Sequence, residues 1–461
     1  MKNNTKSSSG IILILFLGVL MGALDISIVG PAIPSIAQTI KMDSKALVWI
    51  FSIYVLFNLS GISLMAKLSD RFGRRRIYVI SILIFAVGSI IVAFAGNYTF
   101  LLVGRAIQGF GSSGIFPVAS AVIGDIYPPE KRGRALGLIG SVFGIAFMVG
   151  PITAGLMLKY LSWNYLFLIN LPIASFVIWR SLKILPTRKN RALNAIDWKG
   201  IILLSSFLFF FAISLYAITP EKIIQSLLSL HFIGLFLFSV LLLILLVLSE
   251  KNVQDPVVML SFFKSRQLIV VLIIASGAGI FQASFVFMPG LAVSAFGVVP
   301  SKASFMLIPS VIAIAIGAPL WGRLLDKFGS RAVIVIGLSF TCLGLLLISK
   351  ISHEVNNFYV AGALFGFGLS ALVGSSLRYI ALNEVSGDER ATSQGMIAIF
   401  ISTGQIMGSV LIGVIAALKG KTEGFKTAFF WISVISLILI VVSFLLKSRK
   451  NELTSAVNSI V

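Results

Sequence analysis

Residues 65–81 of this chain read MAKLSDRFGRRRIYVIS, and residues 321–337, about 256 positions later, read WGRLLDKFGSRAVIVIG. Within the turn itself, Leu68, Asp70, Phe72, Gly73 and Arg75 of the first stretch recur at identical spacing as Leu324, Asp326, Phe328, Gly329 and Arg331 of the second. Each stretch is a short charged turn between two long apolar segments. A charged turn that recurs in both halves of an apolar chain indicates a membrane bundle built from an internal repeat.

Fourteen segments are apolar over the roughly 20 residues that a helix needs to cross a bilayer. They are residues 11–38, 46–68, 76–95, 99–124, 134–158, 164–184, 197–218, 228–249, 268–296, 302–325, 332–350, 357–381, 392–417 and 426–446. The sequence therefore predicts an all-α integral membrane protein with 14 transmembrane helices.

The repeat divides these helices into two bundles of six with two extra helices between them. We predict an N-terminal six-helix bundle over residues 1–190, a two-helix central insertion over 191–255 and a C-terminal six-helix bundle over 256–461. Both charged turns should face the same side of the membrane, so the insertion must contain an even number of spans. Two spans satisfy this requirement.

The composition excludes a soluble protein, because only 11% of the residues are charged and 58% are hydrophobic, against about 25% charged in soluble domains. The net charge of +21 is spread over short inter-helix turns and forms no single patch, which argues against nucleic-acid binding. Basic residues concentrate in cytoplasmic loops, and on that rule turns such as the one with Arg188, Lys189 and Arg191 place both termini in the cytoplasm. The single cysteine, Cys342, allows no internal disulfide and no cysteine cluster for a metal, and we expect no cofactor.

Two apparent nucleotide motifs are false matches. Residues 109–114 fit the glycine pattern of dinucleotide-binding proteins but lie inside an apolar span with no strand before them. Residues 420–422 resemble the end of a phosphate-binding loop, but Ile415 stands where that loop needs a glycine. We therefore expect neither a nucleotide partner nor an enzymatic activity, and an ion gradient or simple diffusion remains as the energy source.

Two charges lie well inside spans, and charged side chains in the bilayer are usually functional or paired. From the helix rise, Asp25 and Arg105 each lie roughly 9 Å from the outer face of the hydrocarbon core, so they share a level. A carboxylate there is suited to taking up and releasing a proton, and we assign Asp25 and Arg105 to proton coupling. The alternative is a purely structural ion pair that fixes helix packing.

The first charged turn suggests a cytoplasmic gate. Asp70, Gly73, Arg74 and Asp125 lie at cytoplasmic helix ends, and contact between Arg74 and Asp125 would hold the inner mouth closed. The second turn supplies Asp326 but has Ser330 in place of Arg74, so the latch would be one-sided. Alternatively, these charges only set the topology.

Polar and aromatic residues inside the spans are candidates for lining a substrate cavity; they are Tyr54, Asn58, Gln108, Phe281, Gln282 and Gln405. In the fifth span, a series of glycines ends in Gly150-Pro151 and Gly155. Glycines at this spacing allow close helix approach and a proline bends the helix, so this stretch either packs against a neighbour or shapes the cavity.

The motifs resemble those of the major facilitator superfamily, in particular its fourteen-helix drug–proton antiporters. Residues 65–81 look like the signature turn between helices 2 and 3, and Arg105 to Gly109 resemble the helix-4 motif tied to proton coupling. Gly150 to Gly155 resemble the helix-5 antiporter motif, although Ala146 and Ala154 replace two of its glycines. Leu24-Asp25 through Pro34 and Leu168 through Pro172 resemble the helix-1 and helix-6 patterns.

The resemblance implies two six-helix bundles around a central cavity, alternating access, and export of small amphipathic compounds such as drugs and antibiotics against proton entry. We expect a monomer in the bacterial cytoplasmic membrane, with protons, lipid and a small substrate as its partners. The alternatives are a narrower exporter of a lipid or metabolite and a membrane sensor without net transport.

Overall fold

The computed structural model describes residues 4–40, 44–187, 197–218, 223–251, 253, 257, 258, 260–351, 354–419 and 421–452. Its α-helices are α1 (Asn4–Ile40), α2 (Ser44–Phe72), α3 (Arg74–Ala93), α4 (Tyr98–Ile126), α5 (Pro129–Tyr160), α6 (Asn164–Leu168), α7 (Asn170–Ile184), α8 (Trp198–Tyr216), α9 (Ile223–Leu227), α10 (Leu230–Glu250), α11 (Arg266–Phe296), α12 (Pro300–Phe305), α13 (Ile308–Phe328), α14 (Ser330–Ser349), α15 (Val355–Ala371), α16 (Leu377–Glu384), α17 (Arg390–Lys419) and α18 (Lys421–Ser443). Short helical turns are η2 (Leu260–Phe263), η3 (Leu372–Ser376) and η4 (Gly387–Glu389).

Fourteen stretches of the described residues are long and apolar enough to cross a membrane, which confirms the predicted fold class. Four of these spans contain more than one helical segment, which the apolar pattern does not show. The span over residues 302–328 includes α12 and α13, and the span over residues 387–416 includes η4 and α17. The span over residues 164–184 consists of α6 and α7, and the span over residues 355–384 consists of α15, η3 and α16. The middle segment of the span over residues 355–384, η3, is a π-helical turn.

The recurring glycines explain why both charged turns are so short. Gly73 separates α2 from α3 with φ of +96°, and Gly329 separates α13 from α14 with φ of +83°. Residues with a side chain rarely adopt such angles, so glycine lets one helix end and the next begin after a single residue. Elsewhere polar caps start the helices; for example, Asn97 Oδ1 accepts a hydrogen bond from Phe100 N at the start of α4.

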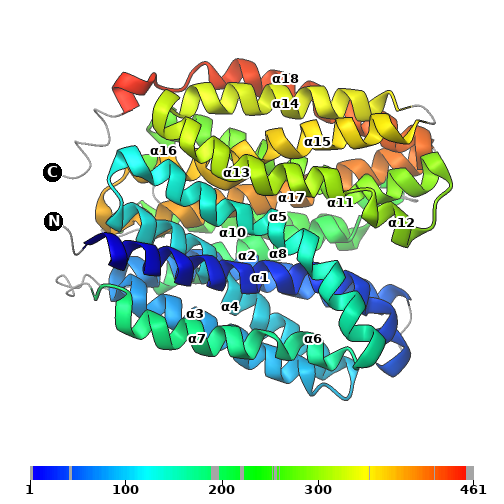
Figure 1. Cartoon of the computed structure of the whole chain (residues 1–461), viewed down its shortest axis with the longest axis horizontal. Coiled ribbons are helices and arrows are strands. Elements are labelled where there is room, and N and C mark those ends of the chain that lie inside the picture. The colour runs from blue at the N-terminus through cyan, green and yellow to red at the C-terminus, as the bar shows by residue number, and fades with distance from the viewer. Residues whose placement is uncertain are drawn as a thin grey trace.

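Helix packing repeats between the two halves of the chain. In the N-terminal half α4 packs on α2 and α3, α5 on α1, and α7 on α1 and α3. The C-terminal half repeats each of these pairs: α15 packs on α13 and α14, α17 on α11, and α18 on α11 and α14. Figure 1 shows the two groups of roughly parallel helices, with α1, α3 and α7 at one side of the molecule and α14 and α18 at the other.

The two halves meet through two crosswise helix pairs. α5 packs along α13, and α2 packs along α17, so the fifth helix of each repeat contacts the second helix of the other. Glycines of α5 make the first contact close. A Cβ at Gly137 would lie 2.5 Å from the carbonyl oxygen of Ala318, and one at Gly144 would lie 2.6 Å from Ala315 N. Gly137 and Gly144 of the fifth span therefore face the opposite bundle.

The two extra spans are α8 and α10. α8 packs on α10 and also on α2 and α17, one of the two helix pairs through which the bundles meet. Ser205 Oγ of α8 donates a hydrogen bond to the carbonyl oxygen of Ser60 in α2 at 2.8 Å. The predicted domain boundaries at 190/191 and 255/256, and the basic residues Arg188, Lys189 and Arg191, lie outside the described residues.

Candidate transport site

Asp25 and Arg105, the two charges predicted inside the membrane, form an ion pair. Arg105 Nη1 donates to Asp25 Oδ2 at 2.5 Å, and both side chains are fully buried. The guanidinium also donates to the carbonyl oxygen of Ile50 at 3.1 Å and to Gln108 Oε1 at 2.8 Å. A buried ion pair needs such additional hydrogen bonds to offset the loss of water.

The second oxygen of the carboxylate is held by amides. Asp25 Oδ1 accepts hydrogen bonds from Gln108 Nε2 at 2.9 Å and from Asn170 Nδ2 at 3.2 Å. The same two amides donate to Ser89 Oγ, at 2.8 and 3.2 Å. The cluster therefore joins α1, α2, α3, α4 and α7, all in the N-terminal bundle. Neither Ser89 nor Asn170 is assigned to the site from the sequence. Ser89 lies in no motif, whereas Asn170 lies within the helix-6 pattern Leu168 to Pro172, which is the signal that points to it.

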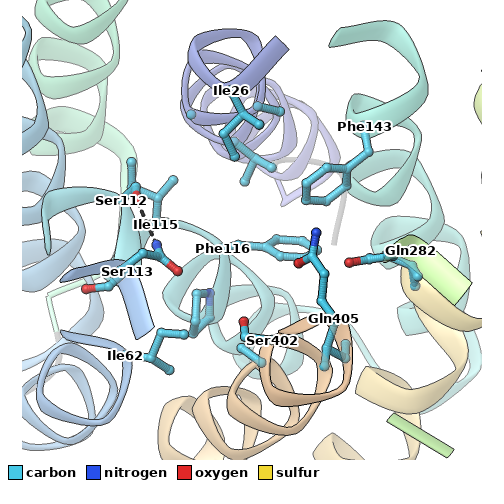
Figure 2. A pocket seen from close by; sticks show the side chains of 18 of the residues that line it. Ile26, Ile62, Ser112, Ser113, Ile115, Phe116, Phe143, Gln282, Ser402 and Gln405 are labelled. Atoms are coloured by element: carbon cyan, nitrogen blue, oxygen red, sulfur yellow. Dashed lines mark hydrogen bonds between the residues drawn. The ribbon is translucent and has the colours of Figure 1, made fainter. Parts of the chain in front are cut away.

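A central cavity lies between the two bundles. Its walls are largely apolar and aromatic, with phenylalanines from both halves, such as Phe143 and Phe285. Figure 2 shows Gln282 and Gln405 of the C-terminal bundle pointing toward the space opposite Ile26 and Phe143, with Ser402 beside them. The cavity thus combines a large apolar surface with a few amide and hydroxyl groups, which is typical of small-molecule sites.

Four of the six predicted cavity residues line this space: Tyr54, Asn58, Gln282 and Gln405. The other two do not. Gln108 is fully buried in the Asp25 cluster, and Phe281 is fully buried in the core of the C-terminal bundle. One helical turn after Phe281, Phe285 reaches the cavity wall. Sequence spacing identifies the helix but cannot tell which of its faces lines the cavity.

Tyr54 connects the cavity to the ion pair. Its side chain lines the cavity, and its ring centroid lies 4.4 Å from the guanidinium carbon of Arg105. Asp25 itself is not among the lining residues that the structure describes. The titratable pair and the cavity are therefore separated by a single aromatic ring that contacts both.

At one end of the molecule, the first charged turn is hydrogen-bonded to the opposite bundle. Asp70 accepts hydrogen bonds from Ala391 N at 2.9 Å and Thr392 N at 2.6 Å, at the beginning of α17. A carboxylate at a helix N-terminus accepts hydrogen bonds from N–H groups that have no partner within the helix, and the positive end of the helix dipole stabilises its negative charge. The same carboxylate forms an ion pair with Arg74.

Asp125 extends this network across the two bundles. It lies 3.0 Å from Arg74 Nε in its own bundle and 2.8 Å from Arg390 Nη1 in the other. Arg74 Nη2 also donates to the carbonyl oxygen of Gly387 at 2.9 Å. The structure thus brings Asp70, Arg74 and Asp125 together, as the proposed latch requires, with Arg390 as an additional member.

The second turn repeats the contact between an aspartate and backbone N–H groups of the opposite bundle, but it lacks the counterpart of Arg74. Asp326 accepts from Gly133 N and Arg134 N, both at 2.9 Å, near the beginning of α5. Arg132 Nη1 donates to Asn383 Oδ1 at 2.5 Å, in the position that the Arg390–Asp125 pair occupies in the first half. Ser330 stands where Arg74 stands in the first turn, and its N–H donates to Glu452 Oε2 at 3.2 Å.

The helix-5 motif lies near the other end of α5. A Cβ on Gly150 would collide with Ser27 of α1, whereas nothing lies within 4 Å of the position of a Cβ on Gly155. Pro151 lies inside the helix, which continues to Tyr160. Gly150 therefore has a packing role against α1, and Gly155 has none within the described structure.

One charged residue of the cavity was missed. From the sequence, Arg105 is the one basic residue expected well inside a span, but Arg378 is 3% exposed within the span over residues 355–384 and lines the cavity. Its position near the end of an apolar run resembles that of a topology-setting arginine. The π-helical turn before it, which the sequence does not reveal, alters the face on which it lies.

Comparison with known proteins gives the family. The family model described as Major Facilitator Superfamily matches residues 15–297 and 268–459. The chain belongs to this superfamily. Its members are transporters, and the fold agrees: the human organic anion transporter MFSD10 superimposes with a TM-score of 0.69 at 16% identity, over 94% of this chain and 99% of that one.

Curated relatives align with this chain over most of its length. "Multidrug resistance protein 3" of Bacillus subtilis (strain 168) is 28% identical over 418 residues, covering 89% of this chain and 80% of that protein. "Riboflavin transporter RibZ" of Clostridioides difficile (strain 630) is 27% identical over 365 residues, covering 78% of each. This chain is therefore a superfamily transporter whose relatives include a protein named for multidrug resistance and one named for riboflavin transport.

Proposed function

We propose that this transporter is a proton-coupled antiporter that exports small amphipathic compounds across the bacterial cytoplasmic membrane by alternating access. The observation that supports this best is the Asp25–Arg105 pair, fully buried and one aromatic ring away from the cavity. A proton on Asp25 removes the charge that holds Arg105. Because Arg105 contacts the Tyr54 ring, a change in the pair alters the cavity wall, and cargo against Tyr54 alters the pair.

The gate supplies the alternation. In this structure Asp70 and Asp326 each bind helix N–H groups of the opposite bundle, so the end with the charged turns is closed. Cavity-lining residues in the far halves of their helices are more accessible: Phe51 is 37% exposed and Val286 57%. We assign this conformation to the outward-facing state, with the charged turns in the cytoplasm. Opening the cytoplasmic end then requires the release of both carboxylates.

The cavity favours amphipathic cargo because aromatic rings cover much of its wall and a few amides can orient a polar group. Relatives named for multidrug resistance or multidrug transport support a broad substrate range. A narrower exporter of one metabolite is the alternative, and the riboflavin transporter among the relatives supports it. A sensor without transport would lack proton flux linked to cargo, so one measurement separates it from both.

The central test is transport in proteoliposomes with an imposed pH gradient, reading cargo and proton flux together. Asp25→Asn keeps the shape and some hydrogen bonds of the carboxylate but cannot titrate. We expect it to bind or exchange cargo without building a cargo gradient, a loss of roughly 100-fold or more in driven accumulation. Arg105→Lys should keep part of the coupling, because the charge remains.

The matched control is Glu250→Gln. Glu250 is also a buried carboxylate, 2% exposed, but it accepts hydrogen bonds from Val257 N and Val258 N beside the inserted helices. We expect this variant to retain proton-driven accumulation. Full accumulation by Asp25→Asn, or equal loss in both variants, would contradict the assignment of Asp25 to coupling.

Topology is tested by single cysteines in a Cys342→Ser background. We propose that both termini and both charged turns are cytoplasmic and that the protein works as a monomer. A cysteine at Thr187, after α7, should then be protected from an impermeant thiol reagent in intact cells. One at Gly96, between α3 and α4, should react, and the position has space for it because no atom lies within 4 Å of its Cβ. Reversed labelling would place the closed end outside.

A further inference from the structure

The charge of the central cavity differs from what the sequence suggests. Among the described residues that line it, Arg378 is the one with a charged side chain. Asp25, the carboxylate predicted inside the membrane, does not line the cavity. It forms an ion pair with Arg105, which in turn contacts the ring of Tyr54. The cavity wall therefore presents one positive charge and no carboxylate in the part of the chain that the structure describes.

Arg378 is poorly satisfied for a buried arginine. Its Nη1 donates to Gln394 Oε1 at 3.4 Å, and its Nε has no hydrogen-bond partner. Arg132, which is also buried, makes hydrogen bonds of 3.0, 2.5 and 2.9 Å from its three nitrogens. A guanidinium has five N–H donors, and a buried donor without a partner is costly. The contrast indicates that Arg378 lacks a partner that Arg132 already has.

The surroundings hold the guanidinium in a position to bind a ligand. Its central carbon lies 3.8 Å from the centroid of the Phe116 ring, which also lines the cavity. Stacking covers one face of the guanidinium and leaves the N–H groups at its edge for a ligand, a geometry that suits carboxylates and other oxyanions. A stacked arginine is more weakly hydrated than a lysine would be, so it tolerates such a site.

The π-helical turn before Arg378 supports a role in the cavity. Residues 372–376 form this turn, and Val373 within it lines the cavity. One extra residue in a turn rotates the following helix by about 100°. Because π turns are rare and frequent at functional sites, the rotation that places Arg378 on the cavity face is consistent with a function in binding.

We infer that Arg378 binds an anionic group of the substrate, so that the cavity takes amphipathic anions or zwitterions in preference to lipophilic cations. The substrate carries a carboxylate or a similar oxyanion on an aromatic or aliphatic body. The anion pairs with Arg378 above Phe116, and the body packs against the aromatic wall that includes Phe147 and Phe285, whose ring centroids lie 6.0 Å apart. This inference rests on the proposed export function and names its substrate class.

The test uses triplets of probes that differ only in charge. Each triplet carries a carboxylate, a primary amide or a primary amine on the same naphthalene, biphenyl or anthracene ring. Binding to the purified full chain is measured by thermal shift and calorimetry, without any gradient. We expect the carboxylate to bind about tenfold or more tightly than the amide and the amine, the size of one charge-assisted hydrogen bond.

Variants then locate the preference. Arg378→Gln should lose the roughly tenfold preference while amide binding changes by less than about threefold, and Arg378→Lys should keep part of it. Arg323→Gln is the matched control, because it removes one positive charge from an exposed position of α13 in the same bundle. It should keep the preference for carboxylates.

The outcomes separate this inference from the proposed function. Tighter binding of amines, a preference that survives in Arg378→Gln, or no binding of any probe would overturn the inference. Cations exported with proton flux would overturn it while leaving the export function in place. Carboxylate binding through Arg378 without proton-linked transport would do the reverse. If Arg378→Gln does not fold, the preference of the wild-type chain among the three charges still decides.

Discussion

The two charged turns descend from one repeat and occupy equivalent positions, yet they hold the closed end differently. In both, an aspartate binds backbone N–H groups near the beginning of a helix in the opposite bundle: Asp70 at α17 and Asp326 at α5. In the first turn an arginine of the turn itself, Arg74, pairs with Asp70 and with Asp125. The second turn has Ser330 at that position.

A second pair of equivalent positions, beside the turns, also differs in charge between the two halves. Arg390 pairs with Asp125 in the first half, whereas Arg132 donates to the neutral Asn383 in the second. The duplicated fold therefore keeps its hydrogen-bond geometry while it removes charge from one half. We infer that the carboxylate-to-helix contacts define where the bundles meet, and that the charged network of the first turn determines how firmly they are held.

The strongest way to break the comparison is Arg74→Ser, which gives the first turn the residue of the second. It leaves Asp70 and Asp125 without their shared partner. Removing one member of a buried pair costs about 3 kcal/mol, or roughly 100-fold in the population of the closed state. Nitroxide labels at exposed Lys131 and Lys327, in a Cys342→Ser background, should report a wider separation of the bundles by pulsed electron resonance.

The matched control is Arg76→Ser, which removes an arginine from the same turn at an exposed position. We expect its distance distribution to match that of the unmodified chain. An unchanged distribution in Arg74→Ser would mean that the Arg74 network does not hold the closed end, and that its charges serve only to orient the chain in the membrane.

A reciprocal exchange sharpens the comparison with a smaller effect. Asp125→Asn should weaken the closed state by about 1–2 kcal/mol, because the hydrogen-bonding shape remains while the charge is lost. Asn383→Asp should strengthen it, since Arg132 gains a carboxylate partner. The double variant should return toward the unmodified distance distribution. If it resembles Asp125→Asn alone, the two positions are not energetically equivalent.

The sequence predicted the membrane architecture well, because apolar length and a repeated charged turn are local signals. It also identified Asp25 and Arg105, since charges are rare inside spans. It did not assign Asn170, which donates to Asp25, or Ser89, which accepts from Asn170 and Gln108, because uncharged polar residues are common in membrane helices. Phe281 and Gln108 were assigned to the cavity, but helix rotation turns them into the core and into the Asp25 cluster.

The position of Arg378 could not be predicted from the sequence, because it depends on an irregular turn of the helix. A helix with regular geometry allows the face of each residue to be inferred from its spacing. The π turn over residues 372–376 breaks that regularity, and nothing in the composition of the stretch marks it. The repeat could not help either, because the equivalent helix of the first half, α4, has no such turn.

The smallest difference between the turns concerns the segment after α18, which reaches the second turn. Arg449 Nη2 donates to the carbonyl oxygen of Asp326 at 2.6 Å, and Glu452 accepts from Ser330 N. Glu452 is 1% exposed, and burial raises the pKa of its carboxyl group above the ordinary value, although the bonds from Ser330 and the charge of Arg449 oppose this. We call the segment after α18 docked when it makes these contacts with the second turn. The Glu452 carboxyl group therefore binds a proton more tightly in the docked segment than in the undocked one.

The sign of the pH effect follows from that difference. Docking is strongest below the ordinary glutamate pKa of about 4.3 and weakens as the pH rises through the raised value. Glu452→Gln is neutral at every pH, so it should remove this dependence and dock more firmly near pH 8, by less than about 1 kcal/mol.

A nitroxide at Asn451 should show mobility that increases from pH 5 to pH 8 in the unmodified chain and stays constant in Glu452→Gln. Glu423→Gln, which changes a carboxylate that is 71% exposed, should keep the pH dependence. Equal mobility of the unmodified chain at both pH values would show that the charge of Glu452 does not control how firmly the segment binds the second turn.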